Sequence, residues 1–219
     1  MLSFKNITHI YDNEVLIDDF SLDINKKEII TIIGPSGCGK STLLKLVTKQ
    51  VELQRGNIIN DQKNIGYQSQ KDLLLPWLTI YDNIILPLTI KKKDIDPKKI
   101  NELIKVFDFD NCLNLYPSQI SGGMKSRANL LRTFLMSGDL ILLDEPFTGL
   151  DMITKYRLID WLDQTLRILG KSVLYITHDI DEAIKISDKI IIVSKGPLKI
   201  IKTLEVKDFD KQVILDTLI

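Results

Sequence analysis

Apolar and polar residues mix closely along the first 24 residues, as they do in strands that bury one face. This pattern covers residues 2–10 and 15–24. A short, mostly apolar run over residues 28–33 follows and stops at Gly34. Such a run is typical of a central strand that is buried on both faces. The first part of the chain therefore predicts half-buried strands followed by a buried one.

After the glycines that follow Ile33, apolar residues recur at helical spacing, and residues 41–49 predict a helix. Residues 76–117 predict a mostly helical region, because Ile80, Ile84 and Leu88 recur at helical spacing. Further elements are predicted as strands at 140–143, 172–176 and 190–193, helices after Ser121 and Asp151, and a final helix near 208–218. Strands that alternate with helices favour a mostly parallel sheet with right-handed crossovers. The pattern predicts an α/β fold.

Composition limits the classes of function. The chain has 219 residues, of which 44% are hydrophobic, and its 29 basic residues balance 29 acidic ones. Without an overall basic field, nucleic-acid binding is not indicated. Cys38 and Cys112 are far apart, which favours reduced thiols over a disulfide or a metal site. No apolar run approaches the roughly 18 residues that a membrane span needs, so we expect one domain that does not cross a membrane.

A glycine-rich segment lies between the predicted buried strand and the following helix. It fits the pattern G-x-x-x-x-G-K-[ST] and comprises Gly34, Pro35, Ser36, Gly37, Cys38, Gly39, Lys40, Ser41 and Thr42. Glycines let the backbone N–H groups surround a polyphosphate, and the helix presents its positive end to the same anion. Lys40 supplies a charge for the terminal phosphates, and the Ser41 hydroxyl can ligate Mg²⁺. The intact spacing disfavours a chance glycine-rich turn, and the segment predicts nucleotide binding.

Two carboxylates end the predicted strand at 140–143. Asp144 can hold Mg²⁺ directly or through water, and Glu145 can orient or deprotonate an attacking water. A strand that ends in a polar turn is common by itself. Beside a phosphate-binding loop, the catalytic interpretation is favoured because open α/β sheets bind ligands at strand ends.

Ser121, Gly122 and Gly123 precede another predicted helix. A serine before two glycines is a suitable N-cap, and the helix start is a second place where an anion can bind. The simpler alternative is a helix cap with no ligand.

These motifs, in this order, resemble the ATP-binding-cassette (ABC) family over nearly the whole chain. The matching segments are Tyr11, the loop 34–42, Gln70, Ser121–Gly123, residues 143–146, Gly149–Asp151 and Thr177–Asp179. The resemblance implies a P-loop NTPase fold of ABC ATPase type: a mixed sheet, an antiparallel β subdomain and a helical subdomain near 71–137. Only residues 194–219 follow the last predicted strand, so we expect one ABC domain over 1–219 without a C-terminal regulatory domain.

The resemblance also implies roles for residues in binding and hydrolysing ATP with Mg²⁺. Tyr11 would stack on adenine, although aromatic residues in early strands usually serve packing. Gln70 would contact Mg²⁺ and orient the γ-phosphate, Glu145 would polarise the attacking water, and Lys40 would neutralise the β- and γ-phosphates. His178 would sense the γ-phosphate, although a lone histidine is more often structural. Ser121–Gly123 and Asp151 would complete the site of a second subunit, in a homodimer or a pseudo-symmetric pair.

Two further segments resemble importers of the nitrate, sulfonate and taurine type. One is Met124, where many family members have glutamine, and the other is the apolar stretch 73–79. Trp77 within it either packs in the core or lines a groove for a membrane subunit. The implied function is an importer ATPase at the cytoplasmic face of the membrane, working with a permease and, indirectly, a solute-binding protein. Within this group the solute could be an oxyanion, a sulfonate, a pyrimidine-type vitamin precursor or a similar small molecule.

Other functions remain open at this stage. A freestanding exporter ATPase is compatible with the same motifs. A soluble ABC protein of translation or DNA repair usually carries two cassettes or long insertions, which this chain lacks. A kinase or GTPase would not account for Ser121–Gly123 or for Thr177 and His178.

Overall fold

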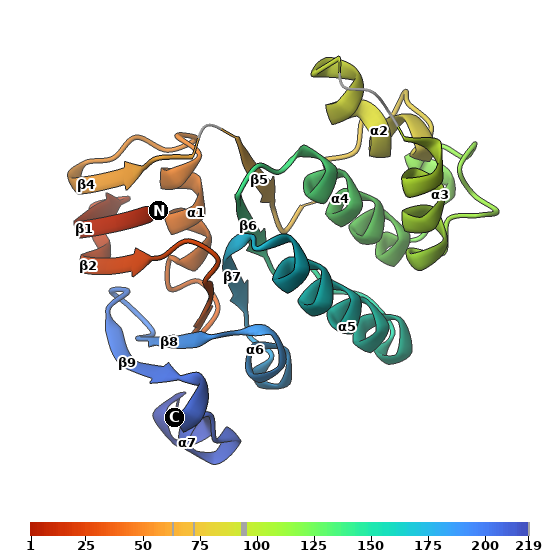
Figure 1. The fold of residues 1–219 in the computed structure, drawn as a ribbon. Helices are drawn as coiled ribbons and strands as arrows, with labels where there is room; N and C mark the ends of the chain where they lie inside the picture. The colour runs from red at the N-terminus through yellow and green to blue at the C-terminus, as the bar shows by residue number, and fades with distance from the viewer. Residues whose placement is uncertain (63, 72, 93–95, 219) are drawn as a thin grey trace.

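The computed structural model describes residues 1–62, 64–71, 73–92 and 96–218, which form two sheets and a set of helices (Figure 1). The larger sheet has the strand order β5-β6-β7-β3-β8-β9. Its strands are β3 (Ile29–Ile33), β5 (Ile65–Gln68), β6 (Leu140–Asp144), β7 (Ser172–Thr177), β8 (Lys189–Val193) and β9 (Ile200–Glu205). Neighbouring strands are parallel except for β9, which runs antiparallel to β8. The mixed sheet predicted from the sequence is confirmed.

Burial explains why the central strands have such apolar sequences. Every residue of β3, β6 and β7 is buried, so these strands pack on both faces. A strand in this position reads as a continuous apolar run, because neither face meets water. Parallel pairing brings the carboxyl ends of the three strands to the same edge of the sheet.

A smaller antiparallel sheet has the order β2-β1-β4 and lies beside helix α1 (Lys40–Val47). Its strands are β1 (Leu2–Tyr11), β2 (Glu14–Ile24) and β4 (Arg55–Asn60). Phe4 and Phe20 meet edge to face across β1 and β2. Their hydrophobic cluster continues through α1 to β6 and β7, so it joins the two sheets. The predicted antiparallel subdomain is confirmed.

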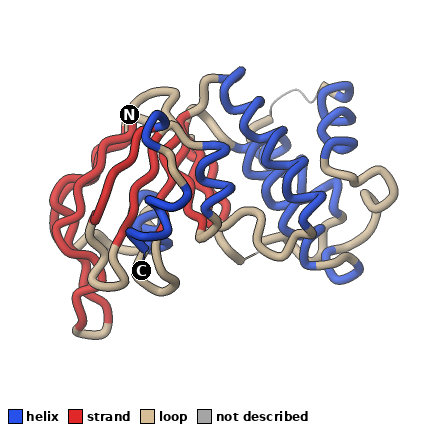
Figure 2. Tube along the Cα trace, turned by 90° about the horizontal axis from the view of Figure 1, so that it is seen from below, coloured by secondary structure: helices blue, strands red, loops and turns tan. Residues whose placement is uncertain are grey.

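The helices α2 (Ile80–Ile90), α3 (Pro97–Val106), α4 (Gly122–Met136) and α5 (Met152–Leu169) gather on one side of the molecule, away from the small sheet (Figures 1 and 2). Trp161 of α5 packs edge-on against Phe107 and Phe134. Arg127 of α4 donates to the Phe107 carbonyl over 2.7 Å. Residues 107–116 lie in the predicted helical region, but in the structure they form turns. Asp108 has a φ of +55°, which is not helical, and the guanidinium of Arg127 lies over the ring of Phe109.

Two short helices complete the chain: α6 (Ile180–Ile186) and α7 (Lys211–Leu218). The final helix begins later than expected, because Val206–Asp208 form a 3-10 turn. Strand β9 was not predicted. β9 lies at the edge of the sheet, and Leu204 is the only buried residue of this strand. Its sequence therefore lacks the alternation of apolar and polar residues that marks a half-buried strand. In the described part of the chain, no helix is both long and apolar enough to cross a bilayer.

A candidate nucleotide site at the carboxyl edge of the sheet

The loop between β3 and α1 has a backbone that requires glycine. Gly39 caps α1 with a φ of +108°, which side-chain-bearing residues rarely adopt. At Gly34, a Cβ atom would lie 2.5 Å from Cγ2 of Val193 on the neighbouring strand β8. The loop therefore packs tightly against β8 at its start and ends at the N-terminus of α1, where an anion can bind.

Lys40 is held inside this loop, with only 5% of its surface exposed. Its Nζ donates to the carbonyl oxygens of Gly34 at 2.8 Å and of Pro35 at 2.7 Å. The ammonium group is thus fixed by the main chain beside the loop. A phosphate entering the loop would meet a cation that is already in position.

A pocket of about 260 Å³ opens at the loop. Its lining residues are Leu16, Ser36, Gly37, Gly39, Lys40, Ser41, Thr42, Gln70 and Glu145. The structure therefore brings the glycine-rich loop together with two residues that lie far along the chain, Gln70 and Glu145. The pocket is open and polar, which suits a charged ligand.

The hydroxyl of Ser41 donates to Oδ1 of Asp144 over 3.0 Å, across 103 positions of sequence. Burial raises the pKa of Asp144, and the neighbouring Glu145 raises it further, while the Ser41 hydrogen bond acts in the opposite direction. These two hard oxygen ligands fit Mg²⁺, which takes one or two protein oxygens and obtains the rest from phosphate and water. Among the described residues, no group of three or more His, Cys, Asp or Glu side chains forms a closed metal cage.

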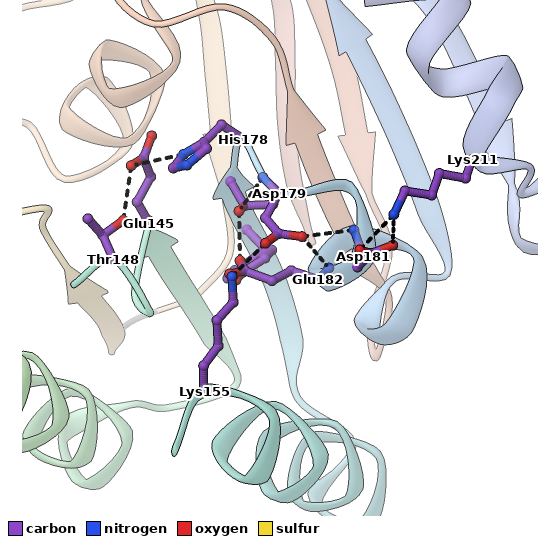
Figure 3. Close-up of polar contacts among 10 residues, drawn as sticks. Glu145, Thr148, Lys155, His178, Asp179, Asp181, Glu182 and Lys211 are labelled. Atoms are coloured by element: carbon purple, nitrogen blue, oxygen red, sulfur yellow. Dashed lines mark hydrogen bonds and ion pairs between the residues drawn. The ribbon is translucent and has the colours of Figure 1, made fainter. Parts of the chain in front are cut away.

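Glu145 is fixed at the end of β6 by contacts on both its backbone and its side chain. Its N–H donates to the Ile176 carbonyl over 2.9 Å, and its φ is +49°. Oε2 accepts from Thr148 Oγ1 at 3.1 Å and lies 3.3 Å from Nδ1 of His178 (Figure 3). His178 is 62% exposed in its side chain. The carboxylate and the imidazole can therefore both reach a ligand at the pocket mouth.

Tyr11 lies in an adjoining hollow of about 530 Å³. This hollow shares Leu16 and Gly37 with the first pocket and also includes Cys38. Tyr11 is mostly exposed, so the simple alternative that it packs in the core does not hold. Its ring is free to stack on a planar group bound next to the phosphate loop.

The other predicted binding residues lie elsewhere. Ser121 caps α4 by accepting from the Met124 N–H at 3.3 Å, and Asp151 caps α5 by accepting from the Thr154 N–H at 2.9 Å. Backbone hydrogen bonding lowers the pKa of Asp151. A Cβ on Gly123 would lie 3.2 Å from the Gly149 carbonyl, so the two segments are neighbours. Neither segment contributes to the described lining of the pocket.

Sequence reasoning missed several side chains near His178. Thr148 contacts Glu145, while Lys155, Tyr175 and Glu182 form a polar cluster beneath the histidine (Figure 3). The spacing of Asp179 and Glu182 at the start of a helix could have indicated that these residues act together. Tyr175 gave no such indication, because it stands in an apolar strand.

Known proteins share much of this sequence over most of its length. A family model described as ABC transporter matches residues 17–148. The formylaminopyrimidine import ATP-binding protein of Halalkalibacterium halodurans is 40% identical over 90% of this chain and 81% of the relative. The aliphatic sulfonates import ATP-binding protein of Bacillus cereus is 37% identical over 88% of this chain and 79% of the relative.

A solved structure has the same fold. The ATP-binding cassette MJ0796, in a dimeric post-hydrolysis state bound to ADP and Pi, matches with a TM-score of 0.83 and 26% identity. The match covers 95% of this chain and 100% of that one.

The buried carboxylate of Asp144 should lower stability at neutral pH. Because its folded-state pKa is raised, ionisation costs folding free energy above that pKa, and the cost disappears as pH falls through it. We expect Asp144→Asn, which still accepts from Ser41, to raise the unfolding temperature without ligand at pH 7 by roughly 2–4 °C, as about 1 kcal/mol does in chains of this size. Thermal unfolding at pH 7 and at lower pH measures this, and the difference should shrink with falling pH. Asp139→Asn, at an exposed position next to the start of the same strand, should change the unfolding temperature little. An Asp144→Asn variant that is less stable than wild type at pH 7 would contradict the expectation.

Proposed function

The chain belongs to the ABC transporter family, and on this premise we propose that it is the ATP-hydrolysing subunit of an importer for a small solute. It is an ABC ATPase, as the family match and the neighbouring structure with ADP and phosphate indicate. The observation that carries the proposal is the pocket in which Lys40 and Glu145 meet, with His178 beside Glu145.

The phosphates of ATP would lie in the loop 34–42. Lys40 and the loop N–H groups would neutralise the β- and γ-phosphates, which is the main requirement of phosphoryl transfer. Tyr11 would stack on the adenine ring from the adjoining hollow. When bound, Mg²⁺ supplies charge neutralisation between the phosphates, and Ser41, Asp144 and Gln70 are the residues that would hold it.

Glu145 would act as the general base. Its carboxylate accepts a proton from water while the water oxygen bonds to the γ-phosphorus and the bond to the bridging oxygen of ADP breaks. The Thr148 and His178 contacts hold the carboxylate in one orientation. Gln70 and His178 would orient the water and the γ-phosphate, so the residues act chiefly by positioning.

The site is completed by a second copy in this proposal. Ser121–Gly123 and Asp151 are exposed or partly exposed, and they lie outside the described lining of the pocket. In a two-fold dimer, the helix start at Ser121 would face the γ-phosphate of the partner, where its positive end favours an anion. The dimeric state of the similar cassette supports this arrangement. ATP would then join the subunits, and hydrolysis would release them.

A membrane permease would bind at the loop that contains Trp77. Trp77 is 69% exposed and Leu73 is exposed as well, whereas Leu74 is buried in the core. Buried Asn83 holds the loop: its side chain accepts from the Leu75 N–H at 2.7 Å and donates to the Leu75 and Leu78 carbonyls at 3.1 and 3.2 Å. A rigid loop with an exposed indole is suited to receiving a helix from a partner.

The relatives named as import proteins favour import over the alternative, a freestanding exporter ATPase. Their named solutes, a formylaminopyrimidine and aliphatic sulfonates, support a small solute for this chain as well. Residues 1–219 would form one ABC domain, and its helical subdomain, near 71–137, would hold α2, α3 and α4. Its place of action would be the cytoplasmic face of the membrane.

Removing the general base should stop hydrolysis. We expect Glu145→Gln to lower kcat for ATP by about 10²–10⁴-fold, because amide cannot accept the proton. It should also form a dimer in ATP and Mg²⁺ that size-exclusion chromatography detects, because the ATP that joins the subunits persists. Glu102→Gln, at an exposed position on α3, should behave as wild type. Hydrolysis by Glu145→Gln at the wild-type rate would exclude the assigned role.

A negative charge at Ser121 should prevent dimer formation without preventing ATP binding. Aspartate can still cap α4, but it would face the partner's γ-phosphate and repel it. In the Glu145→Gln background, we expect Ser121→Asp to abolish the ATP-dependent dimer while each monomer still binds ATP. Ser118→Asp, exposed and three residues earlier, should leave the dimer intact. A dimer that persists in Ser121→Asp would show that this helix start does not meet the nucleotide.

Trp77 should determine attachment to the membrane. In cells that produce the chain naturally, we expect Trp77→Glu to reduce the amount in the membrane pellet on the order of tenfold, as loss of an aromatic hot spot does. Ile168→Glu, at a position that is 83% exposed on α5, is the matched control and should stay in the pellet. Both sites are exposed, so unfolding temperatures should change little. Equal pelleting of the two variants would place the permease contact elsewhere.

A further inference from the structure

One lysine bridges the two carboxylates next to His178. Nζ of Lys155 lies 2.5 Å from Oδ2 of Asp179 and 2.6 Å from Oε1 of Glu182 (Figure 3). Burial alone would lower the pKa of Lys155, but the hydrogen bonds and the negative charges of both carboxylates together raise that pKa. The lysine therefore stays charged while it spans the gap from α5 to the start of α6.

Glu182 connects the Lys155 bridge to Thr177, the residue before His178. Only 5% of its side chain is exposed. Its other oxygen, Oε2, accepts from Thr177 Oγ1 at 2.6 Å and from the Tyr175 hydroxyl. Without the lysine, this buried carboxylate would keep two neutral donors and no cation, which is a costly arrangement.

Asp179 connects the bridge to the residue after the histidine. Its N–H donates to Thr177 Oγ1 at 3.0 Å, and its Oδ1 accepts from the Asp181 and Glu182 N–H groups. Burial acts to raise the pKa of Asp179, but the hydrogen bond and charge of Lys155, together with the backbone N–H groups of Asp181 and Glu182, lower that pKa overall. His178 therefore stands between two residues whose positions are both tied to the cluster.

Lys155 also belongs to the first turn of α5. Its N–H donates to the Asp151 carbonyl over 2.9 Å. The segment Gly149–Asp151, which the proposed dimer places between the subunits, is thus one helical turn from the cation. A movement of this segment would carry Lys155 with it.

We propose that Lys155 is a positioning residue, which sets the place of His178 beside Glu145 and links it to the segment Gly149–Asp151. This inference rests on the proposed function, because the histidine matters only if it acts on ATP. The cation does not touch the reacting atoms. It determines where the loop 177–179 holds the imidazole, and through α5 it makes that placement depend on the neighbouring segment.

A second ion pair between the same two helices provides the matched control. Nζ of Lys185 on α6 lies 3.0 Å from Oδ1 of Asp160 on α5, but both side chains are 55% exposed, whereas Glu182 in the cluster is 5% exposed. A role limited to joining α5 to α6 would apply to both lysines. A role in positioning His178 applies to Lys155 alone.

The test measures the histidine directly and hydrolysis separately. The chain has two histidines, and the other, His9, is buried in β1, so its signal reports on folding. In ¹H–¹³C spectra of the full chain, assigned with His178→Asn, we expect Lys155→Met to shift or broaden the imidazole signal of His178 and leave that of His9 in place. In ATPase assays, kcat should fall about tenfold with KM within about twofold, as misplacement of a catalytic group does. Lys155→Arg should restore both readouts, and Lys185→Met should change neither.

Each outcome separates the two proposals. If the His178 signal of Lys155→Met is unchanged, or if kcat and KM change together without recovery in Lys155→Arg, the positioning role is excluded even though the wild type hydrolyses ATP. If the wild type does not hydrolyse ATP, the proposed function fails, and the His178 signal still decides whether Lys155 positions the imidazole.

Discussion

The site depends on the parallel order of three buried strands. β6, β7 and β3 are adjacent, so the segments after them leave the sheet at one edge. Those segments carry Asp144 and Glu145, His178, and the glycine-rich loop. The Ser41–Asp144 hydrogen bond joins the first of these segments to the last. Because each strand is buried on both faces, hydrophobic burial holds the three strands together, and their parallel pairing brings the carboxyl ends to one edge.

The burial that stabilises the strands also imposes a free-energy cost on the polar residues at their ends. Asp144 is an ionisable group at the end of a fully buried strand, and burial works against its charge. Glu145 adopts a left-handed backbone conformation, uncommon for its residue type. Such features fit a site arranged for binding rather than for stability, and a ligand that brings opposite charge would offset part of the cost.

Much of the fold and site could be predicted from sequence, because the signals were local. The loop 34–42 has fixed spacing, and the strand at 140–143 is purely apolar, so both were placed correctly. Edge strand β9 could not be predicted, since exposure removes the pattern that marks a strand. The cluster around Lys155 could not be predicted from the sequence for another reason. Its members come from α5, β7 and α6, and only the folded chain shows that these elements meet. Likewise, Trp77 could have been core or surface until its exposure was known.

Asn83 has a consequence for how this protein can diverge. Its side chain bonds main-chain atoms of the loop, not the side chains of Leu73 or Trp77. The shape of the loop is therefore independent of which residues stand at those two exposed positions. Mutations there can change the surface offered to another protein while the fold and the catalytic edge stay intact. A lineage that duplicates this gene could acquire a different protein partner through few substitutions, with the nucleotide site unchanged.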